Sequence, residues 1–398
     1  MSSNRISVDI LIAGAGIAGS ALACALRVSG LSVMVLEKSG AALDTARGDH
    51  LRPRTVELLE RWGVLQNFLA AGAEKRRASR WFTNSGELLF ESTFDELDVP
   101  HPYYLYLNHE LIGEVMLRAA LEDGRIRLER PIRNFWLERN DASGVAVRVG
   151  LPGGDELTVE AALMVGADGR NSRLRKTCDI PTHVHNYARP IAVYFAKQHG
   201  RGATNPLDVH LGERFMTVVI PRMGGDCKIG VPVDADLGRQ LRSAEEDQQF
   251  ELLAGVFPDL PVSDIRFADL YPPVYLRTDT WVSNNAVLLG DACHAMHPAR
   301  SQGMNTSLDC VAELATVLRA RPLPLQPTSV NELLTDYERR VKPRIDAQLE
   351  KNHAHGIEMD AAGAEAYRAS CAALRGLSAN QHAKRAFAAN AAGYPNTG

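Results

Sequence analysis

The order of residues 8–38 constrains the fold more than any other part of the chain. An apolar run leads into a glycine-rich turn, then an alanine-rich segment, then a second apolar run that ends in an acid and a base. A strand, a tight turn, a helix and a second strand in this order form the βαβ unit that binds dinucleotides at its helix N-terminus. We therefore expect cofactor contacts at Gly14, Ala15, Gly16, Ile17, Ala18, Gly19, Glu37 and Lys38.

Each glycine of this turn has a separate task in such a unit. Gly14 permits the tight turn, Gly16 lets the backbone approach a pyrophosphate, and Gly19 lets the helix pack closely on the strand. Glu37 follows about twenty residues later and suits a ribose hydroxyl, whereas it would repel a 2′-phosphate. The motif predicts an adenine dinucleotide but does not separate FAD from NAD, and an ordinary βαβ unit packed on glycine is the alternative.

The composition argues against several classes of function. The 398 residues carry a formal net charge of −4 and no basic stripe, which argues against a nucleic-acid partner. The 6 cysteines are scattered without a CxxC pair, which argues against a disulfide framework or a metal site and favours a cytoplasmic location. The first apolar run lacks the layout of a signal peptide, and no run is long enough to span a bilayer.

Two further apolar runs end in glycine-containing turns. One is followed by residues 166–175, Gly-Ala-Asp-Gly-Arg-Asn-Ser-Arg-Leu-Arg, which read as a turn and a basic helix start. The other is followed by residues 290–305, a proline-containing loop that precedes a predicted helix over residues 306–318. Gly303 and the amides near that helix start form a second place where an anion or dipole can bind, and a solvent loop is the alternative.

The remaining pattern separates strands from helices. Residues 131–165 predict a β-meander, and residues 187–277 predict an antiparallel sheet whose last strand covers 264–276. A helix over residues 244–257 interrupts that sheet. Helices follow from 333 to about 387, and we expect the last stretch, residues 388–398, to be frayed.

Aromatic and sulfur side chains recur in the predicted antiparallel sheet. Core packing explains any single one of them, but together they could form an apolar floor for a flat ligand. The candidate substrate-binding residues are Tyr194, His210, Phe215, Met216 and Tyr271.

The three turns, in this order along the chain, resemble the single-component (group A) flavin-dependent aromatic hydroxylases, of which para-hydroxybenzoate hydroxylase is the best-known member. The resemblance spans about residues 6–345. It implies non-covalent FAD, NAD(P)H as co-substrate, O₂, and oxygen transfer from a C4a-hydroperoxyflavin to an aromatic ring. It also implies an α/β fold with a Rossmann-like FAD-binding domain, an inserted antiparallel β-sheet substrate domain and C-terminal helices.

Boundaries follow from the same resemblance. We expect the FAD-binding domain in residues 1–75, 107–182 and 278–330. We expect the substrate-binding domain in residues 76–106 and 183–277, and a C-terminal helical segment in residues 331–398.

The resemblance also implies roles for single residues on the ADP side and the flavin side. Glu37 would contact the adenosine ribose, and Arg47 would lie against the flavin side of the cofactor. Asp168 and Gly169 would hold the pyrophosphate region. Many members place an arginine or glutamine before the helix at residue 111 to contact the ribityl chain, and here Asn108 is the candidate for that contact.

The third motif would serve the flavin ring. Gly290 and Asp291 would hold the ribityl chain, and Pro298 would sit beside the isoalloxazine edge. The backbone amides of Gly303, Met304 and Asn305 would point at the flavin oxygen and nitrogen where negative charge collects on reduction.

The family chemistry does not identify the substrate or the residue that would act as its base. His297 and His50 are the first candidates for a base that deprotonates a phenol or hydroxypyridine, with Pro298 beside the reacting ring and His210 and His294 as further candidates. No arginine clamp for a carboxylate stands out, which favours a hydrophobic aromatic substrate from secondary metabolism or aromatic catabolism. Epoxidation of an alkene or indole double bond and a non-oxygenating flavin-binding reductase or binder are the alternatives. The oligomeric state is open, a homodimer included.

Overall fold

The computed structural model describes residues 4–42, 48–198, 206–214, 216–245, 248–249, 252, 262–360 and 363–394. Packing divides the chain into two compact units. Unit 1 comprises Met1–Asp44, Glu110–His185 and Val274–His353, and unit 2 comprises Thr45–His109, Asn186–Pro273 and Ala354–Gly398. This is a division by packing. The expected division into FAD-binding and substrate-binding domains stays a prediction.

Unit 1 is built on a mostly parallel sheet in the order β19-β20-β11-β1-β2-β8, with β10 and β9 joined to one side of β11. Its strands are β1 (Asn4–Ala13), β2 (Val33–Leu36), β8 (Ile126–Glu129), β9 (Asn134–Asp141), β10 (Gly144–Gly150), β11 (Glu156–Gly166), β19 (Val282–Ser283) and β20 (Ala286–Leu288). Ile10, Leu11 and Ile12 of β1 are 0% exposed. Such a continuous apolar run is typical of a parallel strand that is covered on both faces.

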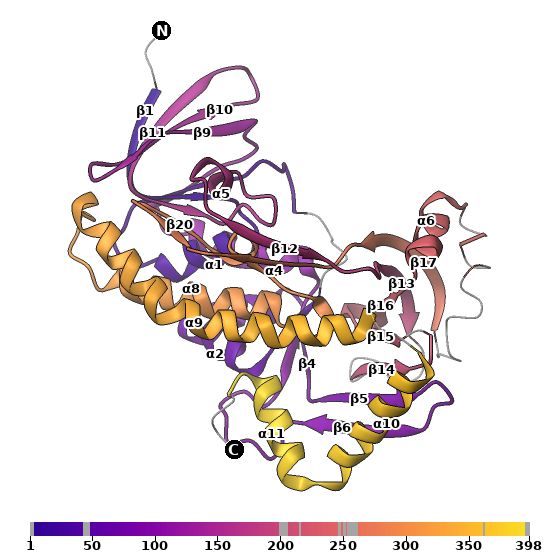
Figure 1. Ribbon diagram of the computed structural model, residues 1–398. Helices are drawn as coiled ribbons and strands as arrows, with labels where there is room; N and C mark the ends of the chain where they lie inside the picture. Colours follow the sequence, from indigo (N-terminus) through magenta and orange to yellow (C-terminus); the bar gives the residue numbers. More distant parts are fainter. Residues whose placement is uncertain are drawn as a thin grey trace. The chain divides into compact units, whose positions relative to one another are not determined.

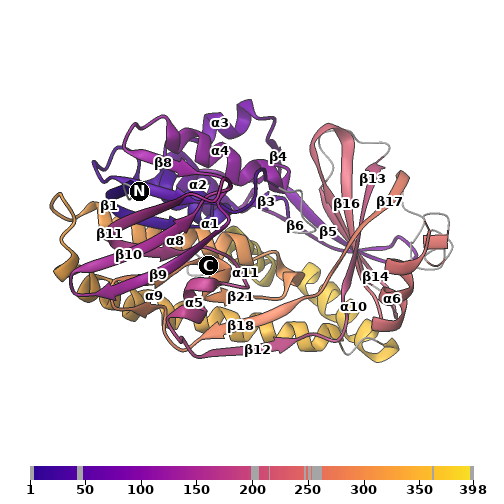
Figure 2. The ribbon, with the colours of Figure 1, turned by 90° about the horizontal axis from the view of Figure 1, so that it is seen from above.

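The expected meander before the second turn is confirmed. Strands β9, β10 and β11 pair in antiparallel succession, and Figure 2 shows them side by side in unit 1. A small sheet in the order β12-β18-β21 adds β12 (Thr182–Asn186), β18 (Val274–Thr278) and β21 (His294–Ala295).

Helices that lie wholly or mostly in unit 1 accompany this sheet. They are α1 (Ile17–Leu26), α4 (His109–Leu121), α5 (Arg173–Thr177), α8 (Gly303–Arg319) and the long α9 (Pro327–Asp360), with the short 3₁₀ turns η3 (Gly290–Ala292) and η4 (Pro298–Arg300). Helices α8 and α9 lie side by side (Figure 1), and the Tyr337 hydroxyl of α9 donates a 3.2 Å hydrogen bond to the Cys310 carbonyl of α8. Among the described residues, no helix has the length and apolar character needed to cross a membrane.

Unit 2 contains a larger, mainly antiparallel sheet in the order β17-β13-β16-β15-β14-β5-β6 and a small sheet in the order β3-β7-β4. The larger sheet consists of β5 (Ala78–Thr83), β6 (Leu88–Thr93), β13 (Ile191–Gln198), β14 (Leu207–Leu211), β15 (Met216–Pro221), β16 (Asp226–Pro232) and β17 (Val262–Tyr271). The smaller sheet consists of β3 (His50–Leu51), β4 (Glu74–Arg76) and β7 (Tyr104–Tyr106). The helical elements are α2 (Pro53–Arg61), α3 (Leu65–Ala70), η2 (Met223–Gly225), α6 (Ala235–Ser243), α10 (Ala364–Ala379) and α11 (Gln381–Ala392).

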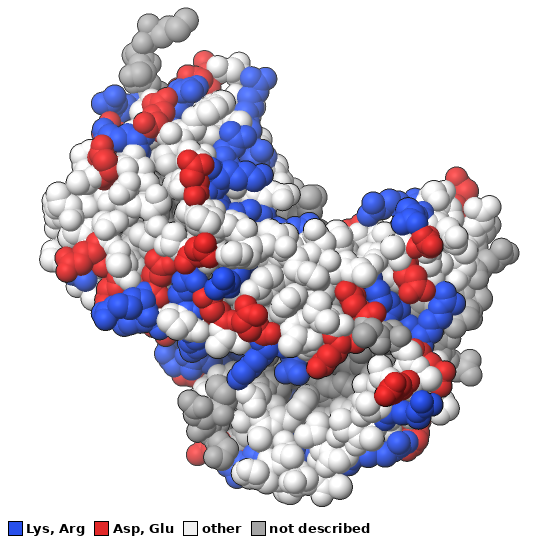
Figure 3. All heavy atoms as spheres, in the orientation of Figure 1, with Lys and Arg blue, Asp and Glu red and all other residues white. Residues whose placement is uncertain are grey.

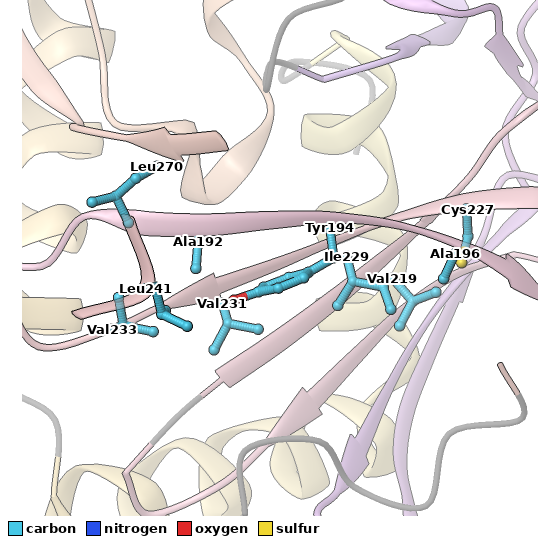
Figure 4. Close-up of a cluster of buried hydrophobic side chains, with 10 residues drawn as sticks. All are labelled: Ala192, Tyr194, Ala196, Val219, Cys227, Ile229, Val231, Val233, Leu241 and Leu270. Atoms are coloured by element: carbon cyan, nitrogen blue, oxygen red, sulfur yellow. The ribbon is translucent and has the colours of Figure 1, made fainter. Parts of the chain in front are cut away.

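Two hydrophobic clusters lie on opposite faces of the larger sheet, because successive side chains of a strand point to opposite sides. Cluster A, shown in Figure 4, contains Ala192, Tyr194, Ala196, Val219, Cys227, Ile229, Val231, Val233, Leu241 and Leu270. Cluster B contains Phe94, Leu97, Tyr104, Tyr106, Leu207, Val209, Ala388, Ala389 and Ala392. Val219 packs in cluster A, whereas its neighbours Val218 and Ile220 pack against cluster B.

The expectations for residues 264–276 and for the end of the chain were wrong. Residues 264–276 form two strands in different sheets, because Pro272 and Pro273 separate β17 from β18 and proline has no N–H for a sheet ladder. The chain end is not frayed from residue 388, because α11 continues to Ala392 and buries its last turns in cluster B. The helix expected over 244–257 lies mostly outside the described residues.

The fold class is as expected from the sequence: an α/β unit with a parallel sheet, a second unit with an antiparallel sheet, and helices at the C-terminal end. Lysine and arginine are interspersed with aspartate and glutamate on the face that Figure 3 shows, in line with the small net charge.

Candidate functional site

The three glycine-containing turns start at the same edge of the sheet in unit 1. Strand β11 pairs in parallel with β1 on one side and with β20 on the other, so Ala13, Gly166 and Leu288 stand in register at the carboxyl ends of the strands. Ligands of open α/β sheets bind at this edge. The sequence analysis predicted three separate motifs, and the pairing brings all three together.

The glycines of the first turn have distinct surroundings. Gly14 has φ +103°, and a Cβ there would lie 2.4 Å from the Ala167 carbonyl oxygen, so the first and second turns touch. A Cβ on Gly19 would lie 1.9 Å from the Gly14 carbonyl oxygen, which shows how closely α1 packs on the turn. At Gly16, by contrast, a Cβ would meet no described atom within 4 Å beyond the chain neighbours. The backbone at Gly16 therefore borders open space.

That space belongs to a cavity of about 750 Å³ in unit 1. It is lined by Gly14, Gly16, Leu36, Glu37, Lys38, Ser39, Ile132, Phe135, Ala167, Asp168, Gly169, Asn171, Arg173, Lys176 and Thr177. Residues of the first two motifs face it together with an apolar wall and several cations. Its volume is within the range of ligand sites in proteins.

Glu37 is held at the end of β2 by two backbone amides. Its Oε2 accepts a 2.7 Å hydrogen bond from the Ala15 N–H, and its Oε1 accepts one of 2.7 Å from the Ser39 N–H. Ile17 and Ala18 follow in the first turn of α1, and Lys38 lines the cavity. The carboxylate is thereby fixed against the glycine turn.

Asp168 lines the cavity, and its two carboxylate oxygens have different surroundings. Oδ2 accepts hydrogen bonds from the N–H groups of Arg173 (2.7 Å) and Leu174 (3.2 Å) at the start of α5. Oδ1 is buried and meets no hydrogen-bond donor among the residues that the structure describes. A buried oxygen in this state suits a ligand that brings a donor.

The second turn is bonded to the third. The Arg175 guanidinium donates hydrogen bonds to the carbonyl oxygens of Ala292 (2.7 Å) and Arg170 (2.8 Å). A Cβ on Gly290 would lie 3.0 Å from the Ala18 Cβ, so the third turn also packs tightly on α1. Asp291 follows in η3 and is half-buried.

The loop after the third turn prepares the start of α8. Pro298 begins η4, and Ser301 then takes a left-handed conformation with φ +49°. Helix α8 starts at Gly303 with no side-chain cap from Gln302. Gly303, Met304 and Asn305 therefore form the first turn of α8, at the positive end of the helix dipole. The predicted start at residue 306 is therefore three residues late.

The two histidines that were candidates for a base lie in different units and differ in their surroundings. In unit 1 the His297 Nδ1 accepts a 3.2 Å hydrogen bond from the Ala299 N–H and caps η4. In unit 2 His50 is 6% exposed, between the rings of Tyr104 and Tyr106, with centroids 5.0 and 5.2 Å away. Burial lowers the pKa of His50 to about 4, which makes it a weak base at neutral pH. A catalytic role for either ring stays a prediction.

The candidate substrate residues of unit 2 fall on different faces of its sheet. Tyr194 is 1% exposed inside cluster A, where core packing accounts for it, whereas Met216 packs against cluster B. His210 stacks on Phe82 at 5.1 Å, and burial lowers its pKa. Tyr271 ends β17 and is half-buried. The candidates Phe215 and Arg47 lie outside the described residues.

Sequence reasoning missed a group of buried charges on the face of β16 that lies opposite cluster A. Lys228 lies in register with Phe195 of β13, and its ammonium is 3.0 Å from the carboxylate of Asp49. Lysine is almost never fully buried unless it is paired. The only signal in the sequence was one lysine in an otherwise uncharged strand core, Cys-Lys-Ile-Gly-Val-Pro, with nothing local to name its partner.

The fold and the cavity define a dinucleotide-binding α/β protein with an additional antiparallel unit, and comparison with known proteins narrows this class. The family described as "FAD binding domain" matches residues 7–352. The chain is 30% identical, over 88% of its length and 70% of the relative's, to a 12-dehydrotetracycline 5-monooxygenase/anhydrotetracycline 6-monooxygenase of Streptomyces rimosus. It is 25% identical, over 79% of its length and 83% of the relative's, to a 6-hydroxynicotinate 3-monooxygenase of Pseudomonas fluorescens.

Solved structures agree in fold. The p-nitrophenol 4-monooxygenase PnpA of Pseudomonas putida DLL-E4 superposes with a TM-score of 0.84 at 18% identity, covering 98% of this chain and 99% of that one. The OxyS anhydrotetracycline hydroxylase of Streptomyces rimosus has a TM-score of 0.75 at 26% identity, covering 98% of this chain and 76% of that one. The chain belongs to the FAD-binding monooxygenase family and is a group A flavin-dependent aromatic hydroxylase that uses FAD and NAD(P)H.

The residues of unit 1 fit the dinucleotide part of FAD. The open space at Gly16 is a cradle that a Cβ would fill, Asp168 lines the same cavity and has one oxygen that receives no hydrogen bond from the described residues, and Glu37 stands at the ribose position of the motif. The role of each single residue remains a proposal.

Proposed function

We propose that this flavoprotein hydroxylates an electron-rich, hydrophobic phenol or hydroxypyridine with O₂ and NAD(P)H, in secondary metabolism or aromatic catabolism. The observation that carries the proposal is the match to the tetracycline monooxygenase over 88% of the chain. Relatives and neighbours named for p-nitrophenol and 6-hydroxynicotinate support the chemical class, because one is a phenol and the other a hydroxypyridine. A hydroxyl group raises the electron density of the ring that is attacked.

FAD supplies the redox and oxygen-transfer chemistry when it is bound, and the protein supplies binding, orientation and exclusion of water. In this proposal the backbone at Gly14 and Gly16 receives the pyrophosphate. Glu37 accepts hydrogen bonds from the ribose, and Asp168 accepts one more from the cofactor through Oδ1, which receives no hydrogen bond from the described residues.

The third turn acts at the flavin end in this proposal. Asp291 accepts hydrogen bonds from the ribityl chain, and Pro298 shapes the edge beside the ring. The N-terminal end of α8 stabilises negative charge, because the positive end of the helix dipole lies there.

The test is a screen of the FAD-loaded protein for substrate-stimulated NAD(P)H oxidation and O₂ uptake. Phenols and hydroxypyridines are compared with their methyl ethers, which keep the size and apolar character but cannot be deprotonated. We expect stimulation by a hydroxylated ring and not by its ether, and one ¹⁸O atom from ¹⁸O₂ in a phenolic product. An epoxide product would favour the alternative reaction. Bound FAD without stimulation by any phenol or hydroxypyridine would contradict the proposal.

A further inference from the structure

Three asparagines carry a buried side-chain oxygen that receives no hydrogen bond from the described residues. Asn108, which precedes α4, and Asn134, which begins β9, are themselves only half-buried, whereas Asn352 of α9 is 1% exposed. A buried amide oxygen without a donor is costly, and an apolar side chain of the same size would avoid that cost. The presence of an amide at position 352 therefore calls for another explanation, which its nitrogen gives.

The nitrogen of Asn352 holds the loop of the third motif. Nδ2 donates a buried 3.0 Å hydrogen bond to the backbone carbonyl of His297. The opposite orientation of the amide would bring two oxygens together, so the contact with His297 fixes which side of the amide donates. His297 directly precedes Pro298, and its own Nδ1 accepts the Ala299 N–H at the start of η4. Asn352 therefore sets the backbone immediately before Pro298.

One turn earlier on α9, a second amide holds the other end of the same loop. Gln348 Nε2 donates a 2.9 Å hydrogen bond to the Oγ1 of Thr306, which lies in the first turn of α8. Thr306 is 0% exposed, and its N–H donates a 2.8 Å hydrogen bond to the Gln302 carbonyl. Residues four apart are neighbours on one face of a helix. Gln348 and Asn352 therefore reach the two ends of the loop from the same face of α9.

The strand that leads into the loop is held by the same part of α9. Strand β21 pairs with β18, and the Tyr275 hydroxyl of β18 donates a 2.6 Å hydrogen bond to Glu350 Oε1. The ring of Tyr275 also lies against that of His353, with centroids 4.5 Å apart. One short stretch of α9, residues 348–353, thus holds both the loop and the strand pair before it, and all of these contacts lie within unit 1.

We propose that Asn352 and Gln348 are positioning residues for the flavin: they hold the loop of residues 297–306 so that Pro298 and the N-terminal end of α8 keep their places at the ring. The inference rests on the proposed role of the third turn at the flavin end. It does not depend on which substrate is hydroxylated, and each measurement below is made without substrate. A failure of the phenol screen and a failure of this inference are therefore separate results.

Hydrogen exchange of the apoprotein and the visible absorption spectrum of the FAD-loaded protein test the inference. In Asn352→Leu we expect amides of residues 297–306 to exchange about fivefold faster, the effect of one net hydrogen bond. We also expect a shifted flavin spectrum, because the surroundings of the ring change. Gln348→Met should show both effects, with the faster exchange concentrated at the start of α8. Wild-type exchange and a wild-type spectrum in a folded Asn352→Leu protein would overturn the proposal.

Asn331→Leu is the matched control. Asn331 lies on the same helix, and its Nδ2 donates a 2.9 Å hydrogen bond to the Asn284 carbonyl, but this bond is exposed and lies outside the loop. We expect wild-type exchange in residues 297–306 and a wild-type flavin spectrum. Equal changes in Asn331→Leu and Asn352→Leu would reflect a general loss of stability and overturn the proposal.

The two readouts must also change together. Faster exchange of the loop with an unchanged flavin spectrum would overturn the proposal, because the loop would then not act on the ring. Where Asn352→Leu fails to fold, Gln348→Met decides by the same two measurements against the same control.

Discussion

The guanidinium of Arg175 donates a 2.7 Å hydrogen bond to the backbone carbonyl of Ala292, 117 residues further along the chain. The bond ties the second glycine-containing turn of unit 1 to the third. Arg175 is 7% exposed, and burial lowers its pKa. Because a second bond goes to the Arg170 carbonyl, one side chain holds two loops at the cofactor edge of the sheet.

Replacing Arg175 should therefore loosen both turns. We expect Arg175→Met to lower the free energy of unfolding by about 2 kcal/mol, since it removes the charged donor from the buried Ala292 carbonyl and from the part-buried Arg170 carbonyl. FAD affinity should fall as well, because the two turns border the cofactor site. Chemical denaturation and FAD titration measure the two effects. Arg125→Met, which removes an exposed guanidinium of the same unit, is the control. If both variants had the same free energy of unfolding and the same FAD affinity, the Arg175 hydrogen bonds would contribute to neither.

Asp291 should matter for the cofactor and little for the fold. It is half-buried in η3 at the start of the third turn. We expect Asp291→Ala to weaken FAD binding at least tenfold, the loss of charge-assisted hydrogen bonds to hydroxyls, while the melting temperature of the apoprotein changes by only a few degrees. Flavin occupancy after gel filtration is the measurement. Wild-type occupancy would mean that the role proposed for the third motif is wrong.

Parts of this site could be predicted from local sequence because local rules determine them. A glycine turn between a buried strand and a helix has one established geometry, and parallel strands place their carboxyl ends at one edge, so Gly14, Asp168 and Gly290 could be expected together. The pairing of Arg175 with Ala292 could not, because nothing near either residue specifies a partner more than a hundred positions away.

Residues whose role depends on a face or on a distant partner were harder to predict. Tyr194 is an aromatic residue of a kind that often contacts ligands, but the pleat of the strand points its side chain into cluster A. The next residue, Phe195, points to the opposite face and contacts Lys228. The end of the chain is alanine-rich and looked frayed, yet Ala388 and Ala392 are small enough to pack into cluster B. In each case a tertiary contact decided the outcome.

Two buried histidines should make the protein sensitive to mild acid. Burial lowers the pKa of His50 and of His294 from the ordinary 6.5 to about 4. Between these values the unfolded chain binds more protons than the folded one, so stability rises with pH through this window and is complete above about pH 6.5. Below about pH 4 the loss is roughly 3 kcal/mol for each ring.

The slope of stability against pH tests this. Denaturant unfolding of His50→Gln at several pH values between 4.5 and 7.5 should show a shallower loss than the wild type. His183→Gln, which removes an exposed ring that contacts Asp279, is measured beside it for comparison. A slope in His50→Gln equal to that of the wild type would contradict a low pKa for His50.

Two glycines of the first turn form a matched pair for the central claim. At Gly14 an alanine would have φ +103° and a Cβ 2.4 Å from the Ala167 carbonyl oxygen, so Gly14→Ala should destabilise the fold itself. At Gly16 the added Cβ would point into open space, and among the described residues it would contact nothing within 4 Å beyond its chain neighbours. A bound cofactor would fill that space.

The most direct measurement is the FAD affinity of apo Gly16→Ala together with its melting temperature. The account predicts a melting temperature close to that of the wild-type apoprotein and FAD binding weakened at least tenfold, because the added methyl group occupies the space of the pyrophosphate. Wild-type FAD affinity in a folded Gly16→Ala protein would contradict the claim that the cofactor lies on this turn.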